Sequence, residues 1–209
     1  MGIFVTIEGP EGSGKTTVAK KIVETLNQNG FKALYTREPG GVAIAEKIRD
    51  IILDVHHTQL DSRCEALLYA ASRRQHLIEK VVPALKEDYI VICDRFVDSS
   101  LAYQGYARDL GMDEIYNINL FAIDQYWPDI TILLDIEPEI GLQRIMKNRQ
   151  NEVNRLDLES LHFHQKVHQG YEIIKEKYAN RITLVDGNQS PEKVFEEVYH
   201  VIESKLHGH

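Results

Sequence analysis

The sequence predicts an α/β fold in three layers, with a five-stranded parallel sheet flanked by helices on both faces. Five short runs rich in β-branched and other apolar residues recur along the 209 residues, and continuous apolarity is typical of strands that are covered on both faces. Segments of helical length separate these runs, and such alternation indicates parallel strands joined by right-handed crossovers. In folds of this class, ligands bind at the carboxyl ends of the strands.

Each element has its own signal in the sequence. Apolar residues at helical spacing predict a first helix around residues 18–26, which ends at the QNG tripeptide, a second around residues 44–52, and a long one from about Arg63 to Leu85. The length suits one core, so we expect a single domain over residues 1–209. Strands are expected at residues 3–8 (IFVTIE), 33–38 (ALYTRE), 89–94 (YIVICD), 130–136 (ITILLDI) and 181–186 (RITLVD).

Composition excludes several classes of protein. A formal net charge of −8 argues against wrapping a nucleic-acid backbone, which requires a basic face. The apolar runs have the length of strands, so we expect no membrane span, and without a signal sequence at the N-terminus we expect a cytoplasmic protein. Cys64 and Cys93 are too few for a disulfide framework, and we expect both to be buried, reduced thiols.

The stretch GPEGSGKTT, residues 9–17, follows the first expected strand. It fits the phosphate-binding pattern GxxxxGK[ST], with a strand before it and a helix after it. Amides of the glycine-rich backbone and the helix N-terminus would bind phosphates, with Lys15 at the β and γ phosphates and the Thr16 hydroxyl on Mg²⁺. ATPases, GTPases and small-molecule kinases share this loop, but the chain has no NKxD-type guanine signature and is short for a mechanical ATPase.

A second anion site is expected at the same edge of the sheet. Asp94 and Arg95 end the third expected strand, where a carboxylate suits the outer shell of Mg²⁺ and a guanidinium suits a second phosphate. A capping pair at a strand end is the alternative for this dipeptide alone. The second strand ends at Arg37 before an EPGG turn, and Arg49 lies on the next helix. These arginines favour an acceptor that carries a phosphate.

Two further segments suit recognition of a nucleobase. Tyr69 and Arg73 are four residues apart and share a helical face, where a ring would stack on a base and a guanidinium would donate to its carbonyl. From spacing alone, core packing of Tyr69 with a solvated Arg73 is the favoured interpretation. In DSSLAYQG, residues 98–105, Gln104 offers a donor and an acceptor, as the edge of a pyrimidine requires. The structural alternative for this run is a helix start capped by Asp98, Ser99 or Ser100, and it is compatible with base recognition.

A lid is expected between the fourth and fifth strands, at about residues 142–156. Helical periodicity lapses in NRQNEVNR, and Arg144, Lys147, Arg149 and Arg155 gather around it. A mobile basic segment would exclude water and place positive charge on a transferring phosphoryl group. The alternative is a solvated charged surface.

Taken together, GPEGSGKTT, TREPGG, AASRR, DRF, SSLAYQG and the segment 144–171 resemble thymidylate kinases, and the resemblance extends over essentially the whole chain. It implies a P-loop nucleoside monophosphate kinase fold, a homodimer, and conversion of dTMP and ATP to dTDP and ADP with Mg²⁺. A serine at position 13 together with an arginine-rich lid is similar to the bacterial type, in which lid arginines supply the catalytic charge.

The resemblance also implies a set of site residues. Tyr69 would stack on thymine, Arg73 and Gln104 would bind its edge, and Tyr103 would crowd the sugar so that a 2′-hydroxyl is disfavoured. The expected ATP-binding residues are Gly9, Pro10, Glu11, Gly12, Ser13, Gly14, Lys15, Thr16 and Thr17. The expected dTMP-binding residues are Glu11, Arg37, Glu38, Pro39, Arg49, Tyr69, Arg73, Arg95, Ser99, Ser100, Tyr103 and Gln104. The expected catalytic residues are Lys15, Arg95, Arg144, Arg149 and Arg155, and the expected metal ligands are Thr16 and Asp94.

Two rival functions remain. A deoxynucleoside kinase acting on thymidine would phosphorylate a neutral hydroxyl and would use Glu38 as its base, but Arg37 and Arg49 would then have no phosphate to bind. A non-catalytic nucleotide switch would bind ATP and a protein partner, but it would leave AASRR and SSLAYQG without a function.

Overall fold

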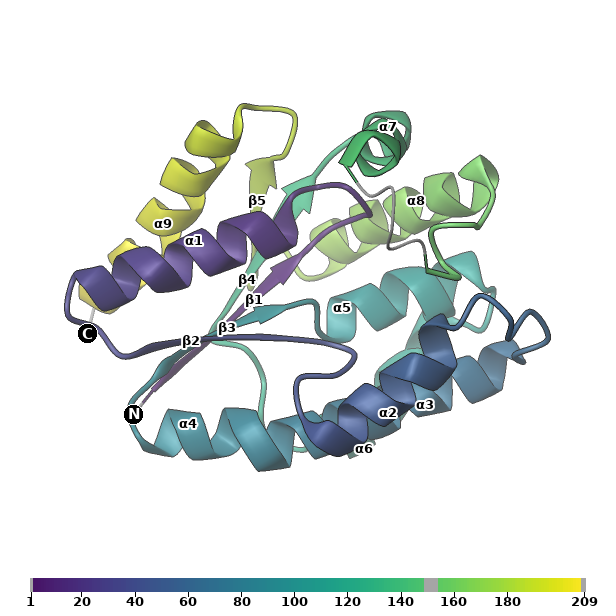
Figure 1. The fold of residues 1–209 in the computed structure, drawn as a ribbon, viewed down its shortest axis with the longest axis horizontal. Coiled ribbons are helices and arrows are strands. Elements are labelled where there is room, and N and C mark those ends of the chain that lie inside the picture. Colours follow the sequence, from purple (N-terminus) through teal and green to yellow (C-terminus); the bar gives the residue numbers. More distant parts are fainter. Residues whose placement is uncertain (1, 149–153, 208–209) are drawn as a thin grey trace.

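The computed structural model of the chain describes residues 2–148 and 154–207. Within this part, a parallel sheet with strand order β2-β3-β1-β4-β5 lies between two layers of helices (Figure 1). The expected five-stranded parallel sheet is confirmed, and every expected strand boundary lies within one residue of the observed one. The strands are β1 (Ile3–Glu8), β2 (Ala33–Arg37), β3 (Ile90–Asp94), β4 (Ile130–Asp135) and β5 (Ile182–Asp186).

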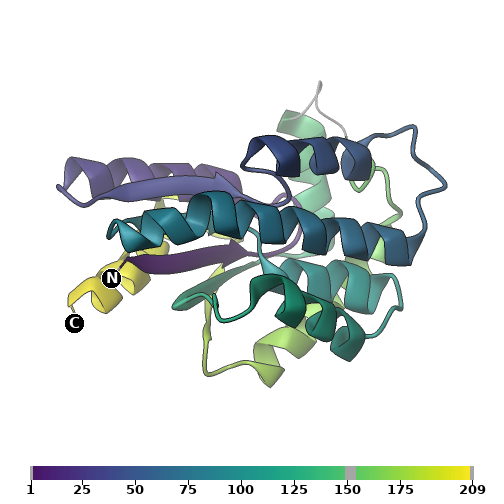
Figure 2. The same ribbon diagram turned by 90° about the horizontal axis from the view of Figure 1, so that it is seen from below.

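The helices form two unequal layers. One layer contains α1 (Lys15–Gln28) and α9 (Pro191–His207), and most of the other helices pack on the opposite face. Three consecutive segments, α3, η1 and α4, continue into one long rod (Figure 2), as the apolar pattern from Arg63 to Leu85 predicts. The remaining elements are α2 (Ala43–Leu53), α3 (Ser62–His76), η1 (Leu77–Val81), α4 (Val82–Lys86), α5 (Val97–Ser100), η2 (Leu101–Ala107), α6 (Met112–Ile123), α7 (Pro138–Asn148) and α8 (Leu161–Lys177).

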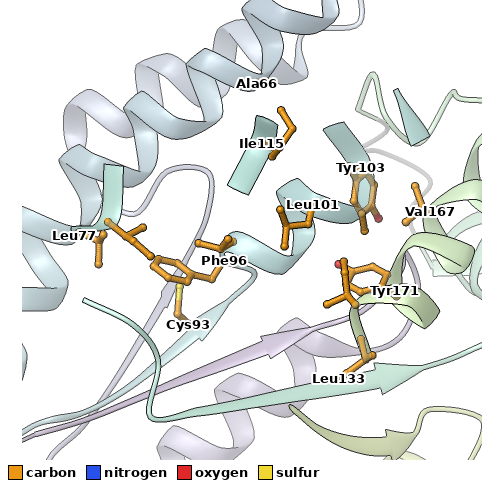
Figure 3. Close-up of a cluster of buried hydrophobic side chains, with 14 of the residues drawn as sticks. Ala66, Leu77, Cys93, Phe96, Leu101, Tyr103, Ile115, Leu133, Val167 and Tyr171 are labelled. Carbon is orange, nitrogen blue, oxygen red and sulfur yellow. The ribbon is translucent and has the colours of Figure 1, made fainter. Parts of the chain in front are cut away.

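Alternate side chains of each strand enter two hydrophobic cores. Val5 and Ile7 pack on the side of α1 and α9, whereas Phe4 packs on the other side, since successive side chains of a strand point to opposite faces. In the second core, residues from β3, η2 and α8 gather, among them Cys93, Tyr103 and Tyr171 (Figure 3). This core extends from the sheet to the segment that follows β3, so packing fixes the residues beyond the carboxyl end of that strand.

Two local expectations are wrong. Cys64 is exposed, because it lies in the first turn of α3 on the side away from the core, whereas Cys93 is buried as expected. Helix α5 begins after Phe96 with no capping side chain, and Asp98 instead forms two hydrogen bonds with Arg181, at 2.6 and 2.7 Å. This ion pair, in which only the Asp98 side chain is buried, removes Asp98 from the backbone amides that an N-cap would bind.

No helix in the described residues combines the length and the apolar character that crossing a bilayer requires.

Candidate functional site

A cavity of about 1350 Å³ opens at the carboxyl ends of the strands. Its walls come from the loop after β1, the turn after β2, α3, the end of β3, η2 and α7. All the expected nucleotide-binding and metal-binding residues line the cavity except Gly9 and Pro10. The part of their loop that lines it begins at Glu11. Lys15, Arg37 and Arg95 therefore share one cavity, as the strand ends predict.

Lys15 lies at the first turn of α1, where the loop turns into the helix. Its Nζ donates to the Pro10 carbonyl at 2.7 Å and to Ser13 Oγ at 3.1 Å, so the loop itself holds the ammonium group. Burial, followed by the nearby charge of Arg95, lowers the pKa of Lys15 to about 8. An anionic ligand would offset both the burial of Lys15 and the repulsion between Lys15 and Arg95. These two cations, which line one cavity, therefore indicate a site for an anion.

A contact between two glycines sets the distance between this loop and α7. Gly12 has a φ of +74°, and a Cβ on it would lie 2.1 Å from the Gly141 carbonyl oxygen on α7. A Cβ on Gly141 would lie 2.2 Å from the Glu11 carbonyl oxygen. The loop and α7 thus meet backbone to backbone. Gly141 lies outside every motif, so the sequence gives no signal for it.

Thr16 and Asp94 come from different elements but meet in the site, and the Thr16 hydroxyl donates to Asp94 Oδ2. A hydroxyl and a carboxylate are hard oxygen donors of the kind that Mg²⁺ prefers. Both residues line the cavity together with Lys15. The residues present therefore fit a magnesium site.

Arg95 adopts a left-handed backbone conformation, with φ of +70°. Its guanidinium binds Glu11 Oε1 at 2.6 Å and lies over the ring of Tyr103. The next amide, that of Phe96, donates to Glu8 Oε1 at 2.7 Å. Burial, followed by the charge of Asp98, raises the pKa of Glu8 to about 7. Glu8 thus holds the turn that presents Arg95.

The turn after β2 supplies two more arginines. Arg37 pairs in register with Asp94, and its Nη2 donates to both oxygens of Glu46, at 2.9 and 3.1 Å. Arg49 donates to the Pro39 carbonyl at 3.0 Å, and burial together with the charge of Arg37 lowers its pKa. Both guanidiniums line the cavity, where an anionic ligand would compete with Glu46 for Arg37 and would pair with Arg49.

Arg73 is buried, with 2% of its surface exposed, so the solvated arginine favoured from spacing alone is wrong. Its Nε donates to Glu38 Oε2 at 2.7 Å, and Nη1 donates to Ser100 Oγ and to Asn119 Oδ1. Nη2 donates to the Phe96 carbonyl at 2.8 Å. Among the described residues these bonds occupy four of its five N–H groups and leave one Nη2–H without such a bond, and Arg73 lines the cavity.

The Glu38 carboxylate that binds Arg73 is fixed from behind by a histidine. His76 Nδ1 lies 2.9 Å from Glu38 Oε1, and His76 Nε2 lies 2.6 Å from Thr36 Oγ1. His76 has no exposed surface. Its link to Glu38 joins residues 38 positions apart, and sequence reasoning missed it.

Gln104 lies on η2, a π-helical segment, and such segments are frequent at functional sites. Its Nε2 donates to Glu65 Oε1 at 2.8 Å. Glu65, Tyr69 and Arg73 recur every four residues on α3, and this spacing is the signal by which Glu65 would have been found. Tyr69 is half-buried and forms part of the cavity wall between them.

The lid arginines differ in position. Arg144 lines the cavity and donates to the Gly187 carbonyl at 3.0 Å. Arg155 does not line it; its Nε donates to the Ile52 carbonyl at 2.9 Å, and its Nη2 donates to Glu65. Arg149 lies outside the described residues.

The chain is similar to known proteins over nearly its whole length. The family model described as thymidylate kinase matches residues 7–198. A thymidylate kinase from Clostridium novyi is 61% identical, over 94% of this chain and 96% of that protein. A second, from Bacillus cereus, is 58% identical, over 98% of this chain and 99% of that protein. The crystal structure of a thymidylate kinase from Ehrlichia chaffeensis superposes with a TM-score of 0.75 at 32% identity, covering 96% of this chain and 98% of that one.

Proposed function

The chain belongs to the thymidylate kinase family, and from this premise we propose that it transfers the γ-phosphoryl group of ATP to dTMP, giving dTDP and ADP. The observation that carries the proposal is that one cavity is lined by Lys15 and Thr16, by Arg37 and Arg95, and by Arg73 and Gln104. One cationic cluster suits the donor phosphates and the other suits the acceptor phosphate. The base-reading residues then distinguish a nucleotide from a simple phosphate.

In the donor half, the loop after β1 binds the ATP phosphates. Its backbone amides and the N-terminus of α1 would donate to the phosphates, and Lys15 would exchange its bonds to Pro10 and Ser13 for the β and γ groups. Thr16 and Asp94 would hold Mg²⁺, directly or through water, and the ion would neutralise charge on the β and γ oxygens. Glu11, which is bonded to Arg95 and near Tyr103, would face the sugar of the acceptor.

In the acceptor half, Arg37, Arg49 and Arg95 bind the phosphate of dTMP, with Ser99 beside them. Tyr69 stacks on thymine, and Tyr103 crowds the position that a 2′-hydroxyl would occupy. The remaining N–H of Arg73, which is held by Glu38 and Ser100, suits the O4 carbonyl of thymine. The two nucleotides then lie end to end, with their phosphates meeting near Arg95.

The reaction needs no general base. A phosphate monoester has its second pKa at about 6, so at neutral pH its oxygen is already ionised and attacks the γ-phosphorus directly. Catalysis then consists of aligning two anions and stabilising a loose transition state with cationic groups. Glu38, the base of the rival thymidine kinase mechanism, binds Arg73 and His76 with its two oxygens, and this engagement favours a phosphate acceptor.

The segment of about residues 142–156 is proposed as the lid, in a single domain over residues 1–209. Arg144 already lines the cavity, which supports a role for its charge at the transferring phosphoryl group. Arg149 and Arg155 are proposed to add charge in the closed state, for which Arg155 would exchange its bonds to the Ile52 carbonyl and Glu65 for the phosphoryl group. Closure of such a segment excludes water from the reaction.

A coupled assay of ADP release tests the function. With ATP and Mg²⁺ present, dTMP should stimulate ADP formation at least ~100-fold over the rate without acceptor, while thymidine should give no more than the background rate. Turnover of thymidine at a comparable rate would establish the deoxynucleoside kinase instead. ADP release that is equal with and without dTMP would exclude both kinases.

We also propose a homodimer that acts in the cytoplasm. Leu67, Ile78 and Phe121 are large apolar side chains that are exposed by 57, 44 and 92%. They lie on α3, η1 and α6, and a hydrogen bond from Arg74 to the Ala122 carbonyl joins α3 to α6. Exposed apolar surface of this kind is typical of subunit interfaces. The cytoplasmic location rests on two free thiols, and fractionation of cells tests it.

The mass of the protein in solution tests the dimer directly. Sedimentation equilibrium should give about twice the chain mass of 24.0 kDa, because a second copy would cover this apolar surface. Phe121→Glu should shift the population to monomers, since it places a charge in the interface. Lys193→Glu, on the distant helix α9, is the control and should leave the dimer intact. A wild-type monomer at micromolar concentration would contradict the proposal.

A further inference from the structure

We propose that Glu65 sets the base specificity of the acceptor site by fixing the orientation of the Gln104 amide. This inference rests on the proposed function, because it concerns which nucleobase the same cavity accepts. Glu65 is a positioning residue: it acts on the substrate only through Gln104. Its side chain is 1% exposed and lies on α3, one turn before Tyr69.

The direction of one hydrogen bond carries the argument. Gln104 Nε2 lies 2.8 Å from Glu65 Oε1. An ionised carboxylate only accepts hydrogen bonds, so the amide must turn its NH₂ group toward Glu65. Gln104 Oε1 then has no hydrogen bond to any described residue, and Gln104 lines the cavity. The amide therefore offers an acceptor to the ligand.

This acceptor selects among pyrimidines. Thymine carries a hydrogen on N3 and a carbonyl at C4, so Gln104 Oε1 would accept from N3 while the remaining N–H of Arg73 donates to O4. Cytosine has the opposite pattern: its N3 is an acceptor and its C4 carries an amino group. Cytosine would thus set acceptor against acceptor at Gln104 and donor against donor at Arg73. Both mismatches leave buried polar groups unpaired.

Two guanidiniums lie against the Glu65 carboxylate. Nη2 atoms of Arg155 and Arg108 both approach Glu65 Oε2, Arg108 at 3.4 Å. Arg108 approaches both oxygens, so a cation stays beside the carboxylate when Arg155 acts in the closed lid. Oε1 receives the amide at 2.8 Å and a long contact of 3.5 Å from Arg108 Nε. Glu65 Oε2 thus binds the guanidiniums, while Oε1 chiefly orients Gln104.

The test is the ratio of kcat/KM for dTMP to that for dCMP. Glu65→Gln keeps the shape of the side chain but allows it to donate, so Gln104 is free to turn and present either group. The ratio should fall by about tenfold or more. Affinities for dTMP and dCMP from isothermal titration calorimetry should shift in the same sense. This binding readout tests Glu65 even if the wild-type enzyme fails to phosphorylate dTMP, an outcome that would overturn only the proposed function.

Glu159→Gln is the matched control. Glu159 is the second carboxylate that binds Arg108, with Oε1 2.5 Å from Nη2, but it makes no hydrogen bond to Gln104. Loss of the Glu159 charge should leave the ratio of kcat/KM for dTMP to that for dCMP unchanged. If Glu65→Gln fails to fold, Glu65→Asp tests the same point, because it keeps the charge and withdraws the oxygen from the amide. An equal loss for dTMP and dCMP would overturn the inference and leave Glu65 a structural residue.

Discussion

Arg95→Ala should lower kcat by about 10³-fold, the cost of losing an arginine from a phosphoryl-transfer site. Arg95 lies where the donor loop meets the acceptor cluster, because its guanidinium binds Glu11 in the loop while the β2–β3 register brings Arg37 beside Asp94. Positive charge at that point stabilises the transferring group between two anions. Steady-state kcat with saturating ATP and dTMP measures the effect.

Two variants separate the charge of Arg95 from its backbone. Arg95 has a φ of +70°, where alanine is strained and glycine is not. Arg95→Gly should therefore lose as much kcat as Arg95→Ala while unfolding at a higher temperature. Arg63→Ala, an exposed arginine at the start of α3, should keep the wild-type kcat. Loss of less than tenfold in both Arg95 variants would mean that the guanidinium is not at the reacting group.

The meeting of distant motifs at one edge of the sheet could be predicted from the sequence. The register pairs Ile7 with Asp94 and Arg37 with Asp94, so three strand ends deliver their following residues to one place. Parallel strands impose this geometry whatever the side chains are. The sequence thus predicts that Lys15, Arg37 and Arg95 line one cavity, and the structure places them so.

The buried partners of these residues could not be predicted, because they depend on contacts between distant segments. Ser99 donates to Glu8 across 91 positions, and Arg155 donates to Glu65 across 90. No local period links such residues. Periodicity places Arg73 on a helical face, but only the packing of α3 against η2 and α6 decides that this face is inside. The solvated interpretation of Arg73 failed for this reason.

The partners that escaped prediction share a physical property. Glu8, Glu65 and His76 are buried polar residues that bind groups lining the cavity rather than the cavity itself. Burying a polar group costs free energy unless a partner satisfies it. Each is therefore a sign that a neighbouring functional group must be held in one orientation.

Gly141→Ala is expected to have the second largest effect, a loss of about 10²-fold in kcat/KM for ATP. The new Cβ would lie 2.2 Å from the Glu11 carbonyl oxygen, which is backbone and moves only with its loop. The loop must then move away from α7, and a displacement of about 1 Å in a site that aligns phosphates costs roughly 10²-fold. KM for ATP should rise more than KM for dTMP, because the loop binds the donor.

The same variant separates packing from helix propensity. Gly141 lies inside α7, where alanine normally stabilises a helix by about 0.5–1 kcal/mol relative to glycine. Overpacking against the loop costs about 1–3 kcal/mol, so thermal unfolding should occur at a lower temperature, not a higher one. Gln143→Ala, an exposed position on the same helix, should leave the unfolding temperature and KM for ATP almost unchanged. A Gly141→Ala protein that unfolds at a higher temperature and keeps its KM for ATP would show that α7 does not set the position of the loop.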